Sequence, residues 1–274
     1  MAKNKMNWIL VVLALSLILV GCHERDVRLE QLTDQEKVMF EYLQENHSAI
    51  HLEDEDAFAD LAILDADIKD KEIFLTGELH GVKANEELHM KFLKYFKDRT
   101  DFRYYLSESS YSFCHFINRY LETGDTKILE ELYKSAKGTF AWTKEGYNFW
   151  KLLRKYNNSL SDDRKIRIIG VDIEHQVDTA YKYLLDVLPS NEPPKEISEK
   201  INGLRGALND IEDDVVLCRA QELLKDMEEK ESLYRKYLGD DFIGFKLVNL
   251  NILNVHEANS KKAVRYIGII PEIE

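Results

Sequence analysis

The chain has 274 residues, of which 45% are hydrophobic, 11% aromatic and 32% charged, with 12 glycines and 4 prolines. This composition supports a sizeable core and excludes a collagen-like chain, a disordered chain and a small disulfide-stapled protein. The 37 basic and 50 acidic residues give a net charge of −13. A nucleic-acid phosphate backbone is therefore not an expected partner.

The N-terminus has the pattern of a bacterial lipoprotein signal. Lys3 and Lys5 precede an apolar run at 6–20, which is short for a permanent membrane span but typical of a secretory signal. The run leads into Gly21-Cys22, which resembles the site where such signals are cut and the cysteine receives lipid. We predict a signal peptide at 1–21 and a lipid anchor on the extracytoplasmic side of the bacterial cell membrane. The alternative is an uncleaved N-terminal anchor.

The next part of the chain is predicted to be helical. A charged tether is expected at 23–32, and Thr33 with Glu36 has the spacing of a helix capping box. Apolar residues then recur at helical intervals, first after this box and again over 56–68.

From residue 71, short apolar runs alternate with amphipathic stretches. The runs predict three strands, at 71–77, 102–107 and 165–171. The amphipathic stretches predict helices at about 84–97, 110–122 and 126–156, and from 177 onward. Because strands alternate with helices, we expect an α/β fold with a mainly parallel βαβ sheet flanked by helices.

Pro193 and Pro194 mark a break in this pattern. Residues 195–260 read as long, charged, amphipathic helices, and the apolar run at 263–270 can form a fourth strand. We therefore expect four parts, which are the signal peptide (1–21), a tether with an N-terminal helix (22–54), the α/β domain (55–190), and a C-terminal helical insertion or cap ending in the strand (191–274).

Each of the three predicted strands ends in an acidic residue. Glu78 and His80 follow the first strand, Glu108 follows the second, and Asp172 and His175 follow the third. Because the ligand crevice of a parallel sheet lies at the carboxyl ends of its strands, we expect these side chains to converge. A carboxylate keeps a nearby histidine basic and oriented, which suits it to activating water.

Other roles stay open for these residues. Glu108 and Asp172 could cap helices or pair with Arg103 and Arg167, and His175 could be a surface histidine. Histidines with carboxylates could also hold a transition metal. The sequence lacks HExxH, paired CxxC and an Asp-rich calcium loop, and we expect no metal and no cofactor. It also lacks GxSxG and Walker patterns, which disfavours a serine hydrolase and a P-loop NTPase.

Six segments occur in an order that resembles one enzyme family. They are FLTGELHG (74–81), YYLSES (104–109), INRYLETGD (117–125), WTKE (142–145), LLRKYN (152–157) and IIGVDIEHQ (168–176). In this order they are similar to the motifs of the erythromycin esterase-like family, within the superfamily that includes the ChaN-like haem-binding lipoproteins. Family members usually run longer and supply a second histidine from their later half, so the resemblance implies a shortened or truncated member.

The resemblance implies a hydrolase that opens an ester or lactone bond in a small-molecule substrate, in an antibiotic-response context. By position, His80 would be the general base, while Glu78 and Glu108 would orient it and share protons. Supporting residues around the pocket would be Glu86, Glu145, Arg154, Asp172 and His175. The alternatives are a haem- or iron-binding lipoprotein of the ChaN-like kind and a non-catalytic remnant.

Overall fold

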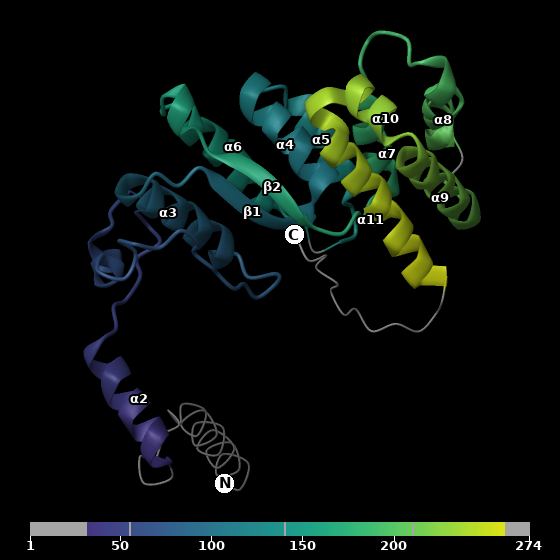
Figure 1. The fold of residues 1–274 in the computed structure, drawn as a ribbon. Coiled ribbons are helices and arrows are strands. Elements are labelled where there is room, and N and C mark those ends of the chain that lie inside the picture. Colours follow the sequence, from purple (N-terminus) through teal and green to yellow (C-terminus); the bar gives the residue numbers. More distant parts are fainter. Residues whose placement is uncertain (1–31, 55, 140, 210, 261–274) are drawn as a thin grey trace, which may run out of the picture. The chain divides into compact units, whose positions relative to one another are not determined.

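The computed structural model describes residues 32–260 except 55, 140 and 210. This part of the chain is rich in helices and contains a small sheet of two parallel strands (Figure 1). The predicted signal peptide, the Cys22 anchor and the predicted strand at 263–270 lie outside the described residues. Among the residues described, no helix has the length and apolar character needed to cross a membrane.

The elements follow one another along the chain with these bounds. The helices are α2 (Asp34–Glu45), α3 (Ala84–Arg99), α4 (Tyr111–Thr123), α5 (Thr126–Ser135), α6 (Lys144–Asn157), α7 (Val177–Asp186), α8 (Lys195–Arg205), α9 (Asp213–Glu229), α10 (Glu231–Leu238) and α11 (Phe242–Ser260). The strands are β1 (Tyr104–Ser110) and β2 (Arg167–Asp172). Short 3-10 turns lie at Ala59–Leu64, Asp162–Arg164, Ala207–Asn209 and Gly239–Asp241.

The chain divides into two compact units. The first comprises the described residues up to Ile50 together with 59–68, and the second comprises 51–58 and the chain from 69 onward. In the first unit, the predicted capping box is confirmed at the start of α2. Thr33 Oγ1 accepts a hydrogen bond from the Glu36 N–H at 3.3 Å, and Glu36 Oε2 accepts one from the Thr33 N–H at 2.8 Å. The helix predicted over 56–68 is wrong, because the structure has only a short 3-10 turn there.

In the second unit, β1 and β2 pair in parallel and are connected through three helices, α4, α5 and α6. Tyr104 lies opposite Arg167, and the register is regular as far as Ser107 opposite Gly170. The parallel pair with its helical crossover confirms an α/β element of the predicted kind. The sheet is smaller than predicted, however, and the described chain is dominated by helices rather than by a flanked parallel sheet.

The first predicted strand, at 71–77, is wrong. The segment is irregular and joins no ladder among the described residues. Ile73 and Leu75 are 73% and 93% exposed, while Phe74 stacks on Phe96 with ring centroids 4.2 Å apart. Because the other two apolar side chains bury so little surface, there is little gain to offset the entropy of ordering them in a sheet.

Two predicted helical regions are interrupted. The region 126–156 splits into α5 and α6, with Gly138 at φ +89° in the connection and Thr143 Oγ1 accepting from the Gly146 N–H at 3.0 Å to start α6. Within the predicted helical region 195–260, the chain breaks at Lys230, where α9 ends and α10 begins. Only backbone groups near a helix end need such caps, so the caps mark the true boundaries.

Two hydrophobic clusters form the core of the second unit. One gathers side chains from α3, α4, α5, α6 and β2, including the fully buried Ile117, Leu129 and Leu153. The other is built by α7 to α11, including Tyr234 and Phe245. Within this group α8 and α11 pack against α7, while α9 packs against α8 and α11. Helix α11 also packs against α4, which directly follows β1 (Figure 1).

In the described part of the chain, side-chain amides pair with the outer edge of β2 where a third strand could lie. Asn118 of α4 donates to the Ile168 carbonyl at 2.7 Å and accepts from its N–H at 2.9 Å. Asn157 of α6 does the same with Ile166, at 2.8 and 3.0 Å. Each amide supplies the donor and the acceptor that a neighbouring strand would offer, so the backbone groups of Ile166 and Ile168 are paired.

The two faces of the sheet differ. One face is covered by α4, and it buries Ser107 and Ile168. Side chains alternate along a strand, so the other face of β1 presents Leu106 together with Glu108. Leu106 on β1 and Val171 further along β2 are 56% and 61% exposed. Glu108 therefore stands on an open, partly apolar sheet face.

Candidate functional site

Three of the predicted site residues come together in the second unit. Glu78, His80 and Glu108 each offer a nitrogen or carboxylate oxygen, and these atoms lie within 4.8 Å of one another. His80 Nδ1 is 2.7 Å from Glu78 Oε1. Two residues come from the segment before α3 and one from the exposed face of β1, so the cluster joins parts that are distant in sequence. It is exposed to solvent.

The loop that carries His80 is held by a tight turn. Gly81 has φ +80°, a conformation that residues with a Cβ rarely adopt. The Leu79 carbonyl accepts from the Val82 N–H at 3.3 Å and from Asn85 Nδ2 at 2.7 Å. These bonds tie the loop to the first turn of α3 and fix where the histidine emerges.

Two more predicted residues, Glu86 and Glu145, add negative charge beside this cluster. Glu86 lies in the first turn of α3 and is half-buried against the start of α6, where a Cβ built on Gly146 would sit 3.4 Å from Glu86 Oε1. Burial raises the pKa of the Glu86 carboxyl, and the charges of Glu78 and Glu145 raise it further. Glu86 therefore keeps its proton to a higher pH than an ordinary glutamate.

This shift predicts a specific pH dependence of stability. Because the folded pKa of Glu86 is raised above its unfolded value of about 4.5, the unfolded chain releases this proton first as the pH rises. Stability contributed by protonated Glu86 is thus lost between pH 4.5 and its folded pKa. In urea unfolding, wild type should lose stability relative to Glu86→Gln across this window. If the difference in unfolding free energy between wild type and Glu86→Gln did not change with pH, the raised pKa of Glu86 would be contradicted.

Sequence reasoning did not single out the aromatic groups around Glu86. Burial raises the pKa of the Tyr105 and Tyr133 phenols, and the charge of Glu86 adds to both shifts. Burial also lowers the pKa of His89, against the opposing charge of Glu78. These groups stay neutral near pH 7. The sequence could have indicated Tyr105, because side chains alternate along β1 and this alternation places Tyr105 on the sheet face that α4 covers.

Asp172 and His175 form a separate pair. His175 Nε2 lies 2.9 Å from Asp172 Oδ2, and Asp172 Oδ1 accepts from the Ile173 N–H at 2.8 Å. Neither residue belongs to the three-residue cluster. Among the described residues no ion pair joins Asp172 to Arg167, and the cap of α4 is Ser110, whose hydroxyl accepts from the Phe113 N–H at 3.3 Å.

Glu174, which the sequence interpretation passed over, is fully buried beside this pair. Its carboxylate accepts hydrogen bonds from the Ser112 N–H at 3.1 Å and from the Ser112 hydroxyl. Burial raises the pKa of Glu174, although these hydrogen bonds oppose the shift. Glu174 thereby joins the segment after β2 to the first turn of α4, where the helix dipole favours an anion.

Replacing Glu174 by alanine should cost about 2–4 kcal/mol of unfolding free energy, because it leaves the buried Ser112 donors without an acceptor. Glu174→Gln retains an acceptor oxygen and should cost less. The exposed Glu130 of α5 offers a control, for which Glu130→Ala should change stability by under about 0.5 kcal/mol. Urea unfolding measures all three. Equal losses of stability in Glu174→Ala and Glu130→Ala would show that the buried hydrogen bonds from Ser112 to Glu174 do not stabilise the fold.

Arg154, another predicted supporting residue, lies away from the acidic cluster. Its guanidinium packs against Gly124, which ends α4 at φ +74°, and a Cβ there would be 2.8 Å from Arg154 Nε. Arg154 Nε finds no hydrogen-bond acceptor among the described residues. Gly124 belongs to the segment INRYLETGD and Arg154 to LLRKYN, so these two family-like segments are in contact here. The contact has a packing role and places Arg154 outside the acidic cluster.

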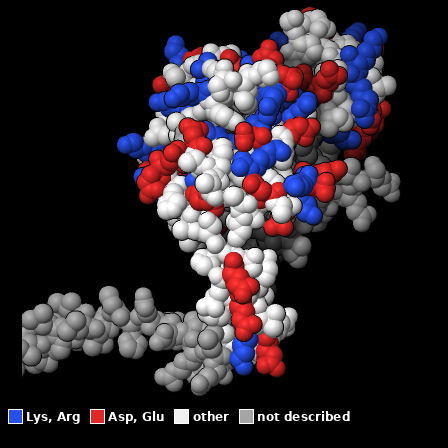
Figure 2. Space-filling model, turned by 90° about the vertical axis from the view of Figure 1, so that its left-hand side faces the viewer, with Lys and Arg blue, Asp and Glu red and all other residues white. Residues whose placement is uncertain are grey.

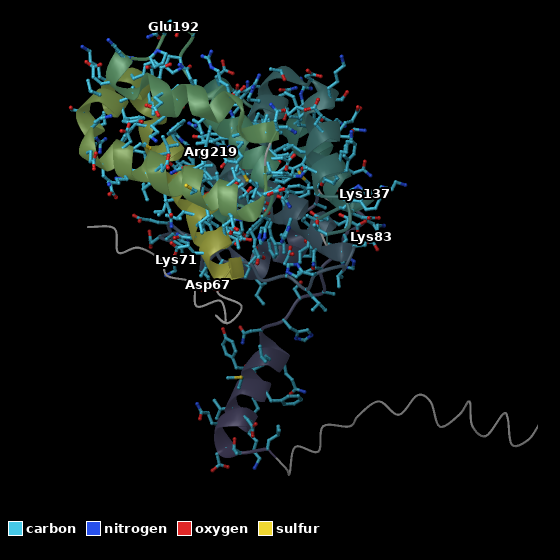
Figure 3. The ribbon with its side chains drawn as sticks, turned by 90° about the vertical axis from the view of Figure 1, so that its right-hand side faces the viewer. Asp67, Lys71, Lys83, Lys137, Glu192 and Arg219 are labelled. Atoms are coloured by element: carbon cyan, nitrogen blue, oxygen red, sulfur yellow. The ribbon has the colours of Figure 1, made fainter. Side chains whose placement is uncertain are left out.

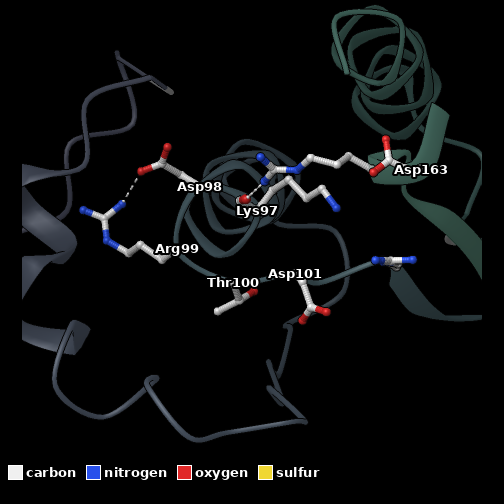
Figure 4. A pocket seen from close by; sticks show the side chains of 8 residues that line it. Lys97, Asp98, Arg99, Thr100, Asp101 and Asp163 are labelled. Carbon is white, nitrogen blue, oxygen red and sulfur yellow. Dashed lines mark hydrogen bonds and ion pairs between the residues drawn. The ribbon is translucent and has the colours of Figure 1, made fainter. Parts of the chain in front are cut away.

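A cavity of about 480 Å³ lies at the opposite, N-terminal end of the strands (Figure 4). It is lined by residues of both signs, which are Lys97, Asp98, Arg99, Thr100, Asp101, Arg103, Asp163 and Arg164. Two of its cationic side chains have partners in the cavity wall. Arg99 Nη1 is 3.0 Å from Asp98 Oδ2, and Arg164 Nη2 donates to the Lys97 carbonyl at 2.6 Å. None of the predicted site residues lines it.

The surface charge is mixed around these features. On the face shown in Figure 2, acidic and basic side chains alternate over the larger unit. Lys83, labelled in Figure 3, precedes α3 and pairs with Glu87, Nζ to Oε1, at 3.0 Å. Its ammonium also interacts with Glu145, so a cation borders the acidic cluster.

Comparisons with known proteins bear on the fold. No protein-family model matches the chain, and no curated protein matches it significantly. A solved structure of a protein from Bacillus cereus is similar, with 20% identity, a TM-score of 0.62 and 82% of this chain covered. A second, described as a succinoglycan biosynthesis protein, has 18% identity, a TM-score of 0.60 and the same coverage. The chain spans 57% of the length of each. At this identity the likeness shows a shared fold.

Proposed function

We propose that this protein is a hydrolase of the erythromycin esterase-like type, in which His80 activates water to attack an ester or lactone carbonyl. The observation that supports this most directly is the contact of His80 Nδ1 with Glu78 Oε1 at 2.7 Å, with Glu108 beside both. We also propose, from the sequence pattern, that a lipid at Cys22 anchors the enzyme to the bacterial cell membrane.

In this proposal His80 and Glu78 have different roles. When Nδ1–H donates to the Glu78 carboxylate, the basic lone pair lies on Nε2, which takes the proton from the attacking water. The carboxylate also stabilises the imidazolium that forms. Glu108, the third member of the cluster, accepts a hydrogen bond from the same water and shares its proton.

Neighbouring groups suit the rest of the reaction. Glu86, whose pKa is raised by burial and by nearby acids, keeps its proton to a higher pH than an ordinary glutamate and can deliver it to the leaving alkoxide. The exposed Leu106 and Val171 share the sheet region of Glu108 and offer an apolar surface to the body of the substrate. A bulky, largely apolar ester or macrocyclic lactone fits these surroundings.

The test is a hydrolysis assay of the full chain carrying Cys22→Ser, against a panel of nitrophenyl esters and macrocyclic lactones. We expect turnover above the buffer rate for at least one substrate. Turnover at the buffer rate across the panel would contradict the proposal. A haem titration runs in parallel, where a Soret band without turnover would instead support the haem-binding alternative.

A further inference from the structure

We infer that Glu78, His80 and Glu108 can alternatively bind a divalent transition-metal ion of the Zn²⁺ or Mn²⁺ class, contrary to the expectation from the sequence that no metal binds. In that state they act as ligands and not as the hydrogen-bonded base. The inference concerns the site of the proposed hydrolase but does not rest on that activity. It starts from the donor set, because one imidazole nitrogen with two carboxylate oxygens is a combination that such ions favour.

The geometry is close to that of a bound ion. Bonds of about 2.1 Å in tetrahedral coordination hold ligand atoms about 3.4 Å apart. The three donor atoms already lie within 4.8 Å of one another, so small side-chain rotations bring them to coordination distance. Glu78 and His80 belong to a loop fixed by the Gly81 turn, and Glu108 belongs to β1. Most of the ordering that binding requires is therefore present beforehand.

Charge also favours a cation here. Two carboxylates bring a formal charge of −2, which one divalent ion neutralises, and the nearby Glu145 adds further negative potential. Three protein ligands leave a coordination position for water or a substrate oxygen, as in catalytic metal sites. A bound ion would supply a Lewis acid at that position.

The chain offers a matched control. His175 and Asp172 form a histidine–carboxylate pair like His80 and Glu78, with a nitrogen–oxygen distance of 2.9 Å against 2.7 Å and similar exposure. The Asp172 pair lacks a third ligand in the described structure. If one histidine and one carboxylate were enough to bind the ion, both pairs would bind it. A three-ligand site requires Glu108 as well, so only the His80 pair would bind.

The experiment uses the full chain with Cys22→Ser and Cys218→Ser, since Cys218 is an exposed thiol that also binds soft metals. Zn²⁺ is titrated by calorimetry, and Co²⁺ by visible absorption, without substrate. We expect one ion per chain, with affinity reduced at least tenfold in His80→Ala and in Glu108→Gln and unchanged in His175→Ala.

Several outcomes would overturn the inference. These are no binding at millimolar Zn²⁺, binding that survives both site substitutions, and Ca²⁺ binding as tight as Zn²⁺ binding, which would indicate a diffuse acidic surface. Because the readout is binding, a chain that hydrolyses esters after chelator treatment but binds no Zn²⁺ refutes the metal site alone. A chain that binds Zn²⁺ and hydrolyses nothing refutes only the hydrolase.

Discussion

Replacing His80 by alanine is expected to lower kcat/KM for ester hydrolysis by about 10²- to 10⁴-fold, the usual contribution of a general base. This corresponds to about 3–5 kcal/mol of transition-state stabilisation. The His80 side chain is 54% exposed, so the substitution removes little packing and the variant should fold as wild type does. Steady-state kinetics on the best substrate of the panel, with circular dichroism to check folding, measures the effect.

His175→Ala is the control for that experiment. His175 also contacts a carboxylate and is 51% exposed, but it stands outside the Glu78, His80 and Glu108 cluster. We expect its kcat/KM to stay within about threefold of wild type, since surface substitutions away from a site have small effects. Equal losses in the two histidine variants would show that neither loss reports on catalysis at His80.

Replacing Gly170 by alanine should cost about 2–4 kcal/mol of unfolding free energy, the largest effect on stability that we expect from adding one methyl group. A Cβ at Gly170 would collide with the Ser110 carbonyl and lie 2.6 Å from the Ser109 carbonyl oxygen. Both obstacles are backbone atoms at the end of β1, so relief requires the strands to separate. That movement would also displace Glu108. Urea unfolding followed by far-ultraviolet circular dichroism measures the loss.

Gly203→Ala provides the contrast. Gly203 lies inside α8, and nothing stands within 4 Å of where its Cβ would be. Alanine there should raise stability by up to about 1 kcal/mol, because it favours helix without a clash. If Gly170→Ala were as harmless as Gly203→Ala, the close approach of β2 to the end of β1 would be disproved.

Several features of the fold were predictable because they depend on neighbours in sequence. The Thr33 and Glu36 box, the strand run at 165–171 and the boundaries of α3 and α4 all follow from local spacing. The segment 71–77 shows the limit of this reasoning. It has the composition of a strand, yet a strand exists only where a partner pairs with it, and the sequence does not say which partner is present.

For the candidate site, too, some contacts could be predicted from the sequence and others could not. The sequence predicts that Glu78, His80 and Glu108 meet, and they do lie together. Placement at a strand end holds only for Glu108, because the segment 71–77 before Glu78 forms no strand. Asp172 was expected there too, but it bonds instead to its own neighbours, Ile173 and His175, which local spacing also permits. Glu174 went unnoticed because its partner Ser112 lies 62 positions away.

The central claim is that Glu78 and His80 act as one unit that activates water, and a double-mutant cycle on kcat/KM tests it most directly. We predict that Glu78→Gln alone lowers kcat/KM by at least tenfold, and that Glu78→Gln with His80→Ala falls no further than His80→Ala alone. If the two losses multiply in the double variant, the residues act independently, and the pair seen at 2.7 Å is not the catalytic unit.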